Sequence, residues 1–74
     1  MINKIINDII ESKGVTNSFL SRETGISADA ISRIRLSKRK VQADELIKLC
    51  IALNIDVGVI ADRLAVQQKN NPPA

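Results

Sequence analysis

The amino-acid sequence predicts an all-α protein in which five short helices pack into one small domain. Apolar residues recur at helical spacing in five separate segments, and no segment alternates apolar and polar residues as a half-buried strand would. The length of 74 residues suits a single domain. Because Phe19 is the one aromatic residue, we expect a core of aliphatic side chains.

Two helices are predicted before residue 25. The first covers residues 1–13, because one side of such a helix carries the isoleucines at positions 2, 5, 6, 9 and 10. Gly14 then suits the left-handed conformation that ends many helices. Thr16 is an N-cap residue for a second, short helix that reaches about Thr24. Gly25 ends this helix, since other residue types are strained in the left-handed conformation.

Several signals agree on the start of a third helix just after this turn. Ser27 is a favourable N-cap residue, and Asp29 lies in the first turn, where the helix dipole favours a carboxylate. Ile26 and Ile31 occupy the positions of a hydrophobic staple. We expect this helix to continue to about Leu36 with its apolar side buried.

The second half of the chain predicts two more helices. The fourth covers residues 43–53 and ends at Asn54, which tolerates the left-handed conformation. The fifth follows the N-cap residue Asp56, and its apolar spacing fades near Val66. The positions that this spacing predicts to be buried are Val57, Ile60, Ala61 and Leu64.

The domain is expected to span residues 1–67, with residues 68–74 forming a disordered polar tail or the start of a linker. No stretch approaches the roughly 18 uncharged apolar residues of a membrane span, and the first residues lack the features of a signal peptide. A free thiol at Cys50 suits a reducing compartment. These features predict a cytoplasmic protein that does not enter a membrane.

The residue types that the chain lacks exclude several kinds of site. With no histidine and a single cysteine, Cys50, it has neither the ligands of a Cys/His zinc site nor the usual general base of a catalytic triad. Its three glycines are too far apart for a phosphate-binding loop. We therefore expect a protein that is not an enzyme and that uses no metal or cofactor.

Positive charge is concentrated in one segment. Residues 33–40, RIRLSKRK, hold five of the eleven basic residues and no acidic residue. The rest of the chain has six basic and eight acidic residues, so the net charge of +3 combines a +5 segment with a remainder of −2. Such a local basic segment favours a polyanionic partner.

The junction of the second and third helices predicts a helix-turn-helix. Gly25 makes the turn, while Leu20, Ile31 and Ile34 are placed to hold the crossing helices together. Here the chain resembles the phage-repressor and Cro family of DNA-binding domains, also called lambda-repressor-like. The run FLSRETGISADAISRIRLSKRK is similar to the two central helices and following loop of that family, and IKLCIALNID is similar to its fourth helix and next turn.

The resemblance implies a sequence-specific regulator of the repressor or Cro type, whose third helix, over about residues 27–36, enters the major groove of double-stranded DNA. Arg33 could bind guanine through two hydrogen bonds. Asp29 could accept a hydrogen bond from cytosine or merely stabilise the helix start. The expected base-reading residues are Ser27, Ala28, Asp29, Ser32 and Arg33. The expected DNA-backbone contacts are Asn17, Arg22, Arg35, Lys38, Arg39 and Lys40.

The chain departs from the family pattern at the end of the third helix. There Arg35-Leu36-Ser37 replaces an acidic residue, a polar residue and glycine, so the helix could run longer. An apolar Leu36 beside the DNA-binding side suits either sugar contacts or a protein partner. The alternative function is therefore a protein-interaction module on the same fold, an antirepressor or antitoxin that binds a repressor or a toxin.

The assembly expected from the resemblance is a homodimer on a palindromic operator, with two recognition helices about 34 Å apart. The fifth helix is the expected interface, because Val59 and Val66 lie off its buried side. The positions assigned to a partner interface are Leu36, Val59, Arg63 and Val66.

Overall fold

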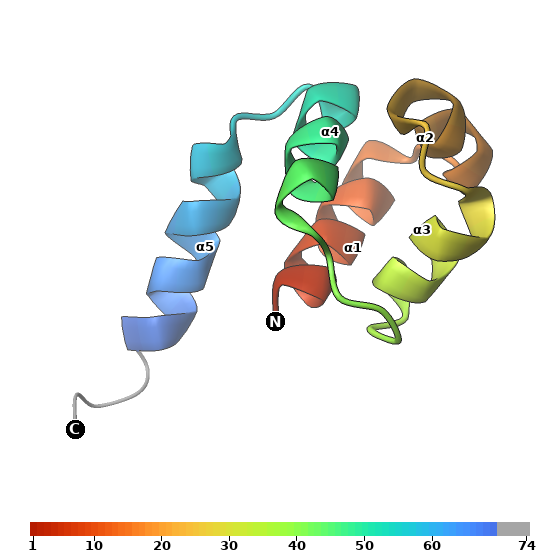
Figure 1. Cartoon of the computed structure of the whole chain (residues 1–74). Coiled ribbons are helices and arrows are strands. Elements are labelled where there is room, and N and C mark those ends of the chain that lie inside the picture. The colour runs from red at the N-terminus through yellow and green to blue at the C-terminus, as the bar shows by residue number, and fades with distance from the viewer. Residues whose placement is uncertain (70–74) are drawn as a thin grey trace.

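The computed structural model describes residues 1–69 and, within them, consists of helices and connecting loops. The helices are α1 (Ile2–Lys13), α2 (Asn17–Thr24), α3 (Ala28–Arg35), α4 (Ala43–Leu53) and α5 (Val57–Lys69). Helices α3 and α5 lie at opposite ends of the molecule, with α1 and α4 between them (Figure 1). The all-α prediction is confirmed, and the α2–α3 pair forms the expected helix-turn-helix.

Local capping explains where the first helices begin and end. The Thr16 hydroxyl accepts a hydrogen bond from the Phe19 backbone N–H at 3.0 Å, and the Ser27 hydroxyl accepts one from the Ala30 N–H at 3.1 Å. Each satisfies a backbone donor that the helix itself leaves unpaired. Gly25 ends α2 with a φ of 77°, in the left-handed region that favours glycine. These predicted caps are confirmed.

The turn between α2 and α3 contains a feature that the sequence pattern did not predict. The buried Thr24 hydroxyl donates to the Leu20 carbonyl at 2.6 Å and accepts from the Ile26 backbone N–H at 3.1 Å. One side chain therefore pairs polar backbone groups on both sides of Gly25, where water cannot reach them. The hydroxyl fixes the chain path from α2 into α3.

An aliphatic core lies beneath this turn and extends between α1, α4 and α5. Leu20, the residue predicted to hold the helix-turn-helix together, is wholly shielded from solvent. Its buried neighbours in the core are Ile5, Ile6, Ile9, Ile10, Ile26, Ile31, Leu49, Cys50, Leu53 and Ile60. Burial of these side chains supplies the main driving force for folding.

The buried Cys50 behaves as a small apolar residue. Its removal from water raises the pKa of the thiol, and the nearby Asp56 carboxylate raises it further. Because the thiolate is the reactive form, this environment disfavours reaction of the thiol in the folded protein.

Helix α3 ends at Arg35, with Leu36 as its C-cap residue, and does not continue past the predicted boundary. The Lys38 N–H donates to the Arg33 carbonyl at 2.8 Å, and the Ser37 N–H donates to the Ile34 carbonyl at 3.1 Å. This is the hydrogen-bond pattern of a Schellman motif. Ser37 therefore adopts a φ of 60°, in a position that usually carries glycine.

Helix α5 buries a narrower stripe than its sequence predicts. Ile60 is buried and Leu64 is half-buried, but Val57 and Ala61, both predicted to be buried, are exposed. Among the described residues, α1 and α4 make the main contacts with this helix, so a single row of side chains suffices to fill the contact. Beyond Val66 the helix continues to Lys69. The predicted tail lies partly outside the described residues, and the domain boundary stays a prediction.

Replacing Ser37 with glycine is expected to stabilise the protein. A non-glycine residue in the left-handed conformation costs roughly 1–2 kcal/mol, of which the greater flexibility of unfolded glycine offsets part. We expect Ser37→Gly to raise the free energy of unfolding by about 0.5–1 kcal/mol, measured by urea denaturation.

Ser18→Gly is the matched control, because the exposed Ser18 has helical geometry in α2. It should lower the free energy of unfolding by about 0.5 kcal/mol. A Ser37→Gly variant less stable than the wild type would contradict the account of strain at Ser37.

Candidate nucleic-acid interface

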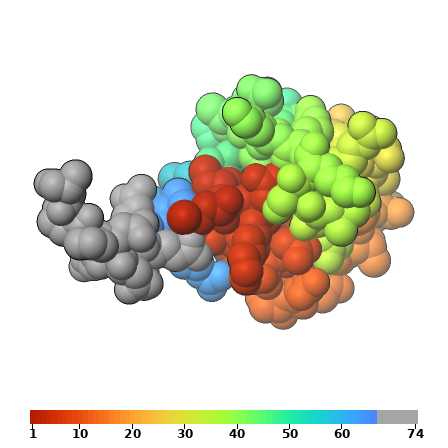
Figure 2. Space-filling view, turned by 90° about the horizontal axis from the view of Figure 1, so that it is seen from below, coloured from red at the N-terminus to blue at the C-terminus, as the bar shows by residue number. Residues whose placement is uncertain are grey.

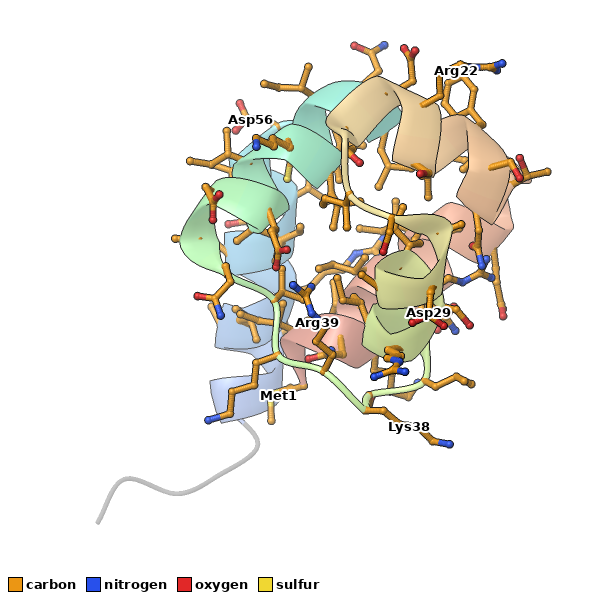
Figure 3. The ribbon with its side chains drawn as sticks, turned by 45° about the vertical axis from the view of Figure 1, so that its right-hand side comes forward. Met1, Arg22, Asp29, Lys38, Arg39 and Asp56 are labelled. Atoms are coloured by element: carbon orange, nitrogen blue, oxygen red, sulfur yellow. The ribbon has the colours of Figure 1, made fainter. Side chains whose placement is uncertain are left out.

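Helix α3 presents a polar side to solvent. Ile31 and Ile34 are buried against the rest of the domain, which turns the opposite side of the helix outward. Figure 3 shows Asp29 on this outer side, directed away from the other helices. The predicted base-reading residues that are exposed in the structure are Ser27, Ala28, Asp29 and Arg33, while Ser32 is half-buried.

Asp29 and Arg33 form an ion pair on this exposed side. The Arg33 Nε atom lies 3.1 Å from the Asp29 Oδ2 atom, one helical turn away. Both side chains are mostly exposed, at 62% for Arg33 and 77% for Asp29. An ion pair so exposed to water contributes little to folding stability.

The loop that follows α3 is fastened to the first helix. Asn3 donates from its side-chain amide to the carbonyl oxygens of Ile34 at 3.0 Å and Arg39 at 2.6 Å. The N-terminal residues accordingly lie beside the yellow-green loop in Figure 2. Residues 36–39 are thus held by the Schellman motif and by Asn3, so the backbone of this part of the loop follows a defined path beside α3.

Arg39 is engaged inside this loop. Its Nη1 and Nη2 atoms donate to the two carboxylate oxygens of Glu45 at 3.0 and 2.9 Å. The Gln42 backbone N–H also donates to Glu45 at 3.0 Å, which caps the start of α4. The hydrogen bonds from Arg39, and to a lesser extent the bond from Gln42, lower the pKa of Glu45. Burial of the carboxylate raises this pKa, but by less. The paired guanidinium ties the loop to α4.

Lys38 and Lys40 remain as the exposed cations of the loop. Among the described side chains, neither takes part in an ion pair. Lys38 projects away from the molecule on the side where Asp29 lies, while Arg39 turns back toward α4 (Figure 3). Of the three predicted loop cations, Lys38 and Lys40 therefore have no acidic partner among the described side chains, whereas Arg39 is paired with Glu45.

Arg35 joins three helices. Its Nε donates to the Asn7 side-chain oxygen and its Nη1 to the Asn17 side-chain oxygen, both at 2.7 Å, while Nη2 lies 3.9 Å from a Glu11 carboxylate oxygen. These groups line a hollow of about 230 Å³ together with Ser32 and Leu36. The guanidinium is thus half-buried and committed to side chains of α1 and α2.

Asn17 and Arg22, the predicted backbone contacts on α2, differ in position. The bond from Arg35 occupies the Asn17 amide oxygen, which leaves the amide NH₂ group available to donate to a phosphate. Arg22 is exposed on α2, and in Figure 3 it lies at the top of the view, whereas Lys38 lies at the bottom. The structure therefore brings Asn17 next to α3 but leaves Arg22 apart.

The predicted partner-interface residues are all exposed but do not lie together. Leu36 is 63% exposed beside α3, whereas Val59, Arg63 and Val66 lie on α5 at the other end of the molecule. Arg63 and Val66 border a hollow of about 300 Å³ between α1 and α5.

Sequence reasoning missed the polar residues that position this surface. Asn3, Asn7 and Glu11 supply the contacts of α1 to α3 and its loop, and Glu45 supplies the contact of α4 to Arg39. One signal was available, because positions 3, 7 and 11 recur at helical spacing beside the isoleucine stripe.

A helix-turn-helix whose second helix is exposed next to a fixed cationic loop is typical of a class of DNA-binding domains. A scan of family models matches residues 5–63, more than half of the chain, to the Cro/C1-type HTH DNA-binding domain. The chain belongs to this family of DNA-binding domains. Searches of curated proteins and of solved structures found no match.

Two further observations concern residues 1–69. None of their helices is long and apolar enough to cross a membrane. No cluster of three or more His, Cys, Asp or Glu side chains among the described residues is arranged to hold a metal ion.

The Arg39–Glu45 pair predicts a pH-dependent contribution to stability. At pH 7, Glu45→Gln should lower the free energy of unfolding by about 1 kcal/mol, because a two-point pair is lost but Arg39 is partly exposed. A lowered pKa means that the folded state favours the charged carboxylate. The contribution is therefore complete above the ordinary value of 4.5 and disappears as the pH falls through the folded-state pKa. Urea denaturation of wild type and variant between pH 7 and 2.5 measures it.

Asp44→Asn is the matched control, since Asp44 is an exposed carboxylate in the same helical turn. Its effect should be smaller and come from the helix dipole alone. A wild-type advantage over Glu45→Gln that persists undiminished at pH 2.5 would contradict the ion-pair explanation.

Proposed function

We propose that this protein is a sequence-specific regulator of the repressor or Cro type, which binds double-stranded DNA with α3 in the major groove. The observation that carries the proposal is that the polar outer side of α3 lies directly beside the loop that Asn3 holds in place, and that this loop exposes Lys38 and Lys40. A major groove about 12 Å wide admits one α-helix, and phosphates border the groove on both sides. Side chains on α3 and in the adjacent loop are thus suited to bases and phosphates respectively.

In this proposal, α3 reads bases with the exposed residues of its outer side. The residues proposed to face the bases are the exposed Ser27, Ala28, Asp29 and Arg33 and the half-buried Ser32. Arginine is suited to guanine because its terminal nitrogens match the two acceptors O6 and N7. Ala28 is suited to an apolar contact with a thymine methyl group. Specificity then comes from a small number of side chains on one helical surface.

The DNA backbone is proposed to be held by two kinds of contact. Lys38, Lys40 and Arg22, which have no acidic partner among the described side chains, contribute mobile positive charge. Asn17 acts from a defined position, because its amide oxygen is hydrogen-bonded to Arg35, whereas Arg35 and Arg39 are engaged within the domain and hold α3 and its loop in place. Contacts of either kind position the protein without reading sequence.

The proposed assembly is a homodimer formed through α5 on a palindromic operator. Val59 and Val66 are exposed on α5, and the hollow beside Arg63 and Val66 offers space for an apolar side chain of a second copy. A symmetric interface at the end opposite to α3 leaves both recognition helices free for half-sites about 34 Å apart. By occupying such an operator, the dimer would block transcription.

One observation favours a second candidate function. Leu36 is 63% exposed next to α3, which suits a protein partner that covers the same side of the molecule. The protein would then act as an antirepressor or an antitoxin. Because the Asp29 carboxylate is paired with Arg33, its repulsion of phosphates is reduced, and that pairing favours the DNA-binding proposal over this one.

A salt titration of binding to duplex DNA tests the main proposal. If Lys38 and Lys40, the exposed cations next to α3, each neutralise one phosphate, together they should contribute about −1.8 per chain to the slope of the logarithm of affinity against the logarithm of salt concentration. Lys38→Ala should reduce the magnitude of that slope by about 0.9 and weaken specific and random DNA alike. Arg33→Ala should weaken a selected site far more than random DNA.

Lys48→Ala, on α4, is the charge-matched control and should leave the slope unchanged. A flat salt response, or no binding at low salt, would refute the DNA-binding proposal and favour the protein-binding candidate. Equal losses on selected and random DNA for Arg33→Ala would show that α3 is not the reading surface.

The dimer proposal predicts that an acidic residue on α5 disfavours self-association. Val66→Asp places a charge on an exposed apolar position, where dimerisation would have to bury it at a cost. Sedimentation equilibrium should show a shift toward monomer, by about tenfold or more in the dissociation constant. Ile51→Asp, the same kind of change on the exposed side of α4, should leave it unchanged. A wild-type protein that binds its operator as a monomer would contradict the dimer.

A further inference from the structure

The Asp29 carboxylate lies beside the Nε edge of the Arg33 guanidinium group. The atom that faces the carboxylate is Nε, at 3.1 Å from Oδ2. A guanidinium group has five N–H donors in a planar fork, of which Nε carries one. Neither terminal nitrogen, Nη1 or Nη2, is hydrogen-bonded to another of the described residues, so both are available for a ligand.

This pairing also restricts where the terminal nitrogens lie. An unpaired arginine at an exposed helical position samples many rotamers, and that freedom is lost when the side chain binds. Asp29 is one turn before Arg33, so it directs the guanidinium along the outer side of α3 toward the helix start. The N-terminal end of a recognition helix is the part that meets base edges.

Resting on the proposed DNA-binding function, we propose that Asp29 is a positioning residue that orients Arg33 to read guanine, and that it is not itself the base-reading group. In the major groove, guanine presents two adjacent acceptors, whereas adenine presents an acceptor and a donor. Two donors held side by side are satisfied only by guanine. The position opposite Arg33 in each half-site is therefore a guanine, and Asp29 sets how strictly it is required.

The charges of the pair support this division of roles. Asp29 lies on the surface proposed to face DNA, where an unpaired carboxylate would be repelled by phosphates. Beside Arg33 its charge is balanced, so the pair adds no net charge to the groove. Asp29 therefore contributes to the choice of base. By cancelling the charge of Arg33, it also weakens the attraction of this surface to phosphates of any sequence.

Selection from a random duplex pool, followed by affinity measurements, tests this inference. The wild-type protein should enrich a site that contains a guanine read by Arg33. Replacing this guanine with another base should weaken binding by about 5- to 150-fold. Asp29→Ala should reduce that preference by roughly threefold or more, with affinity for random DNA unchanged or higher. Arg33→Ala should abolish the preference, and Asp29→Glu, whose carboxylate also reaches one turn along the helix, should retain most of it.

Asp44→Ala is the matched control. Asp44 is the second residue of α4 as Asp29 is of α3, so both substitutions remove one charge and one favourable helix-dipole interaction. Circular dichroism should show similar small losses of stability in the two variants, while only Asp29→Ala should change the preference for guanine.

Two results would overturn the inference alone. One is an Asp29→Ala protein that keeps its full preference for guanine. The other is an Asp29→Ala protein that loses preference only at a neighbouring base pair, which would make Asp29 a direct reader of cytosine. If the wild type enriches no site and its binding is insensitive to salt, the proposed function itself fails, and this inference fails with it.

Discussion

The turn between α2 and α3 is the constraint on which the exposed surface of this domain depends. Gly25 reverses the chain in the left-handed conformation, and the Thr24 hydroxyl bridges backbone groups of Leu20 and Ile26. This turn sets the crossing that buries Leu20 together with Ile31. Because successive helical residues are about 100° apart, the burial of one side of α3 determines which side chains face outward. A different crossing would remove the polar side of α3 from the surface.

The basic segment of residues 33–40 serves two separate purposes in the folded protein. Arg35 and Arg39 each engage several oxygen acceptors and so connect α3 and its loop to the neighbouring helices. Lys38 and Lys40 keep their charges exposed. The division follows from chemistry, because a planar guanidinium fits several acceptors in fixed geometry, whereas an ammonium on a flexible stem is a mobile point charge. The arginines therefore build the surface on which the lysines are presented.

Helix limits were predictable because capping acts over a few residues. Thr16, Ser27 and Asn54 have the side chains that their cap positions require, and the structure uses all three. The buried side of α5 was less predictable, because Ala61 has the right spacing but is exposed. Helical spacing identifies the side that can be buried, whereas the width of the buried stripe depends on the helices packed against it.

The pattern of residues along the chain was sufficient for the five helices, the helix-turn-helix and the concentration of positive charge between residues 33 and 40. It was not sufficient to tell which of those cations stay exposed. For Arg35 that outcome depends on a contact across 28 residues to Asn7, and the loop that carries Arg39 and the lysines is positioned by a bond across 36 residues from Asn3 to the Arg39 carbonyl. Local periodicity places Asn3 and Asn7 on one side of α1 but does not identify their partners, because these contacts form only when the core has brought α1 beside α3 and its loop.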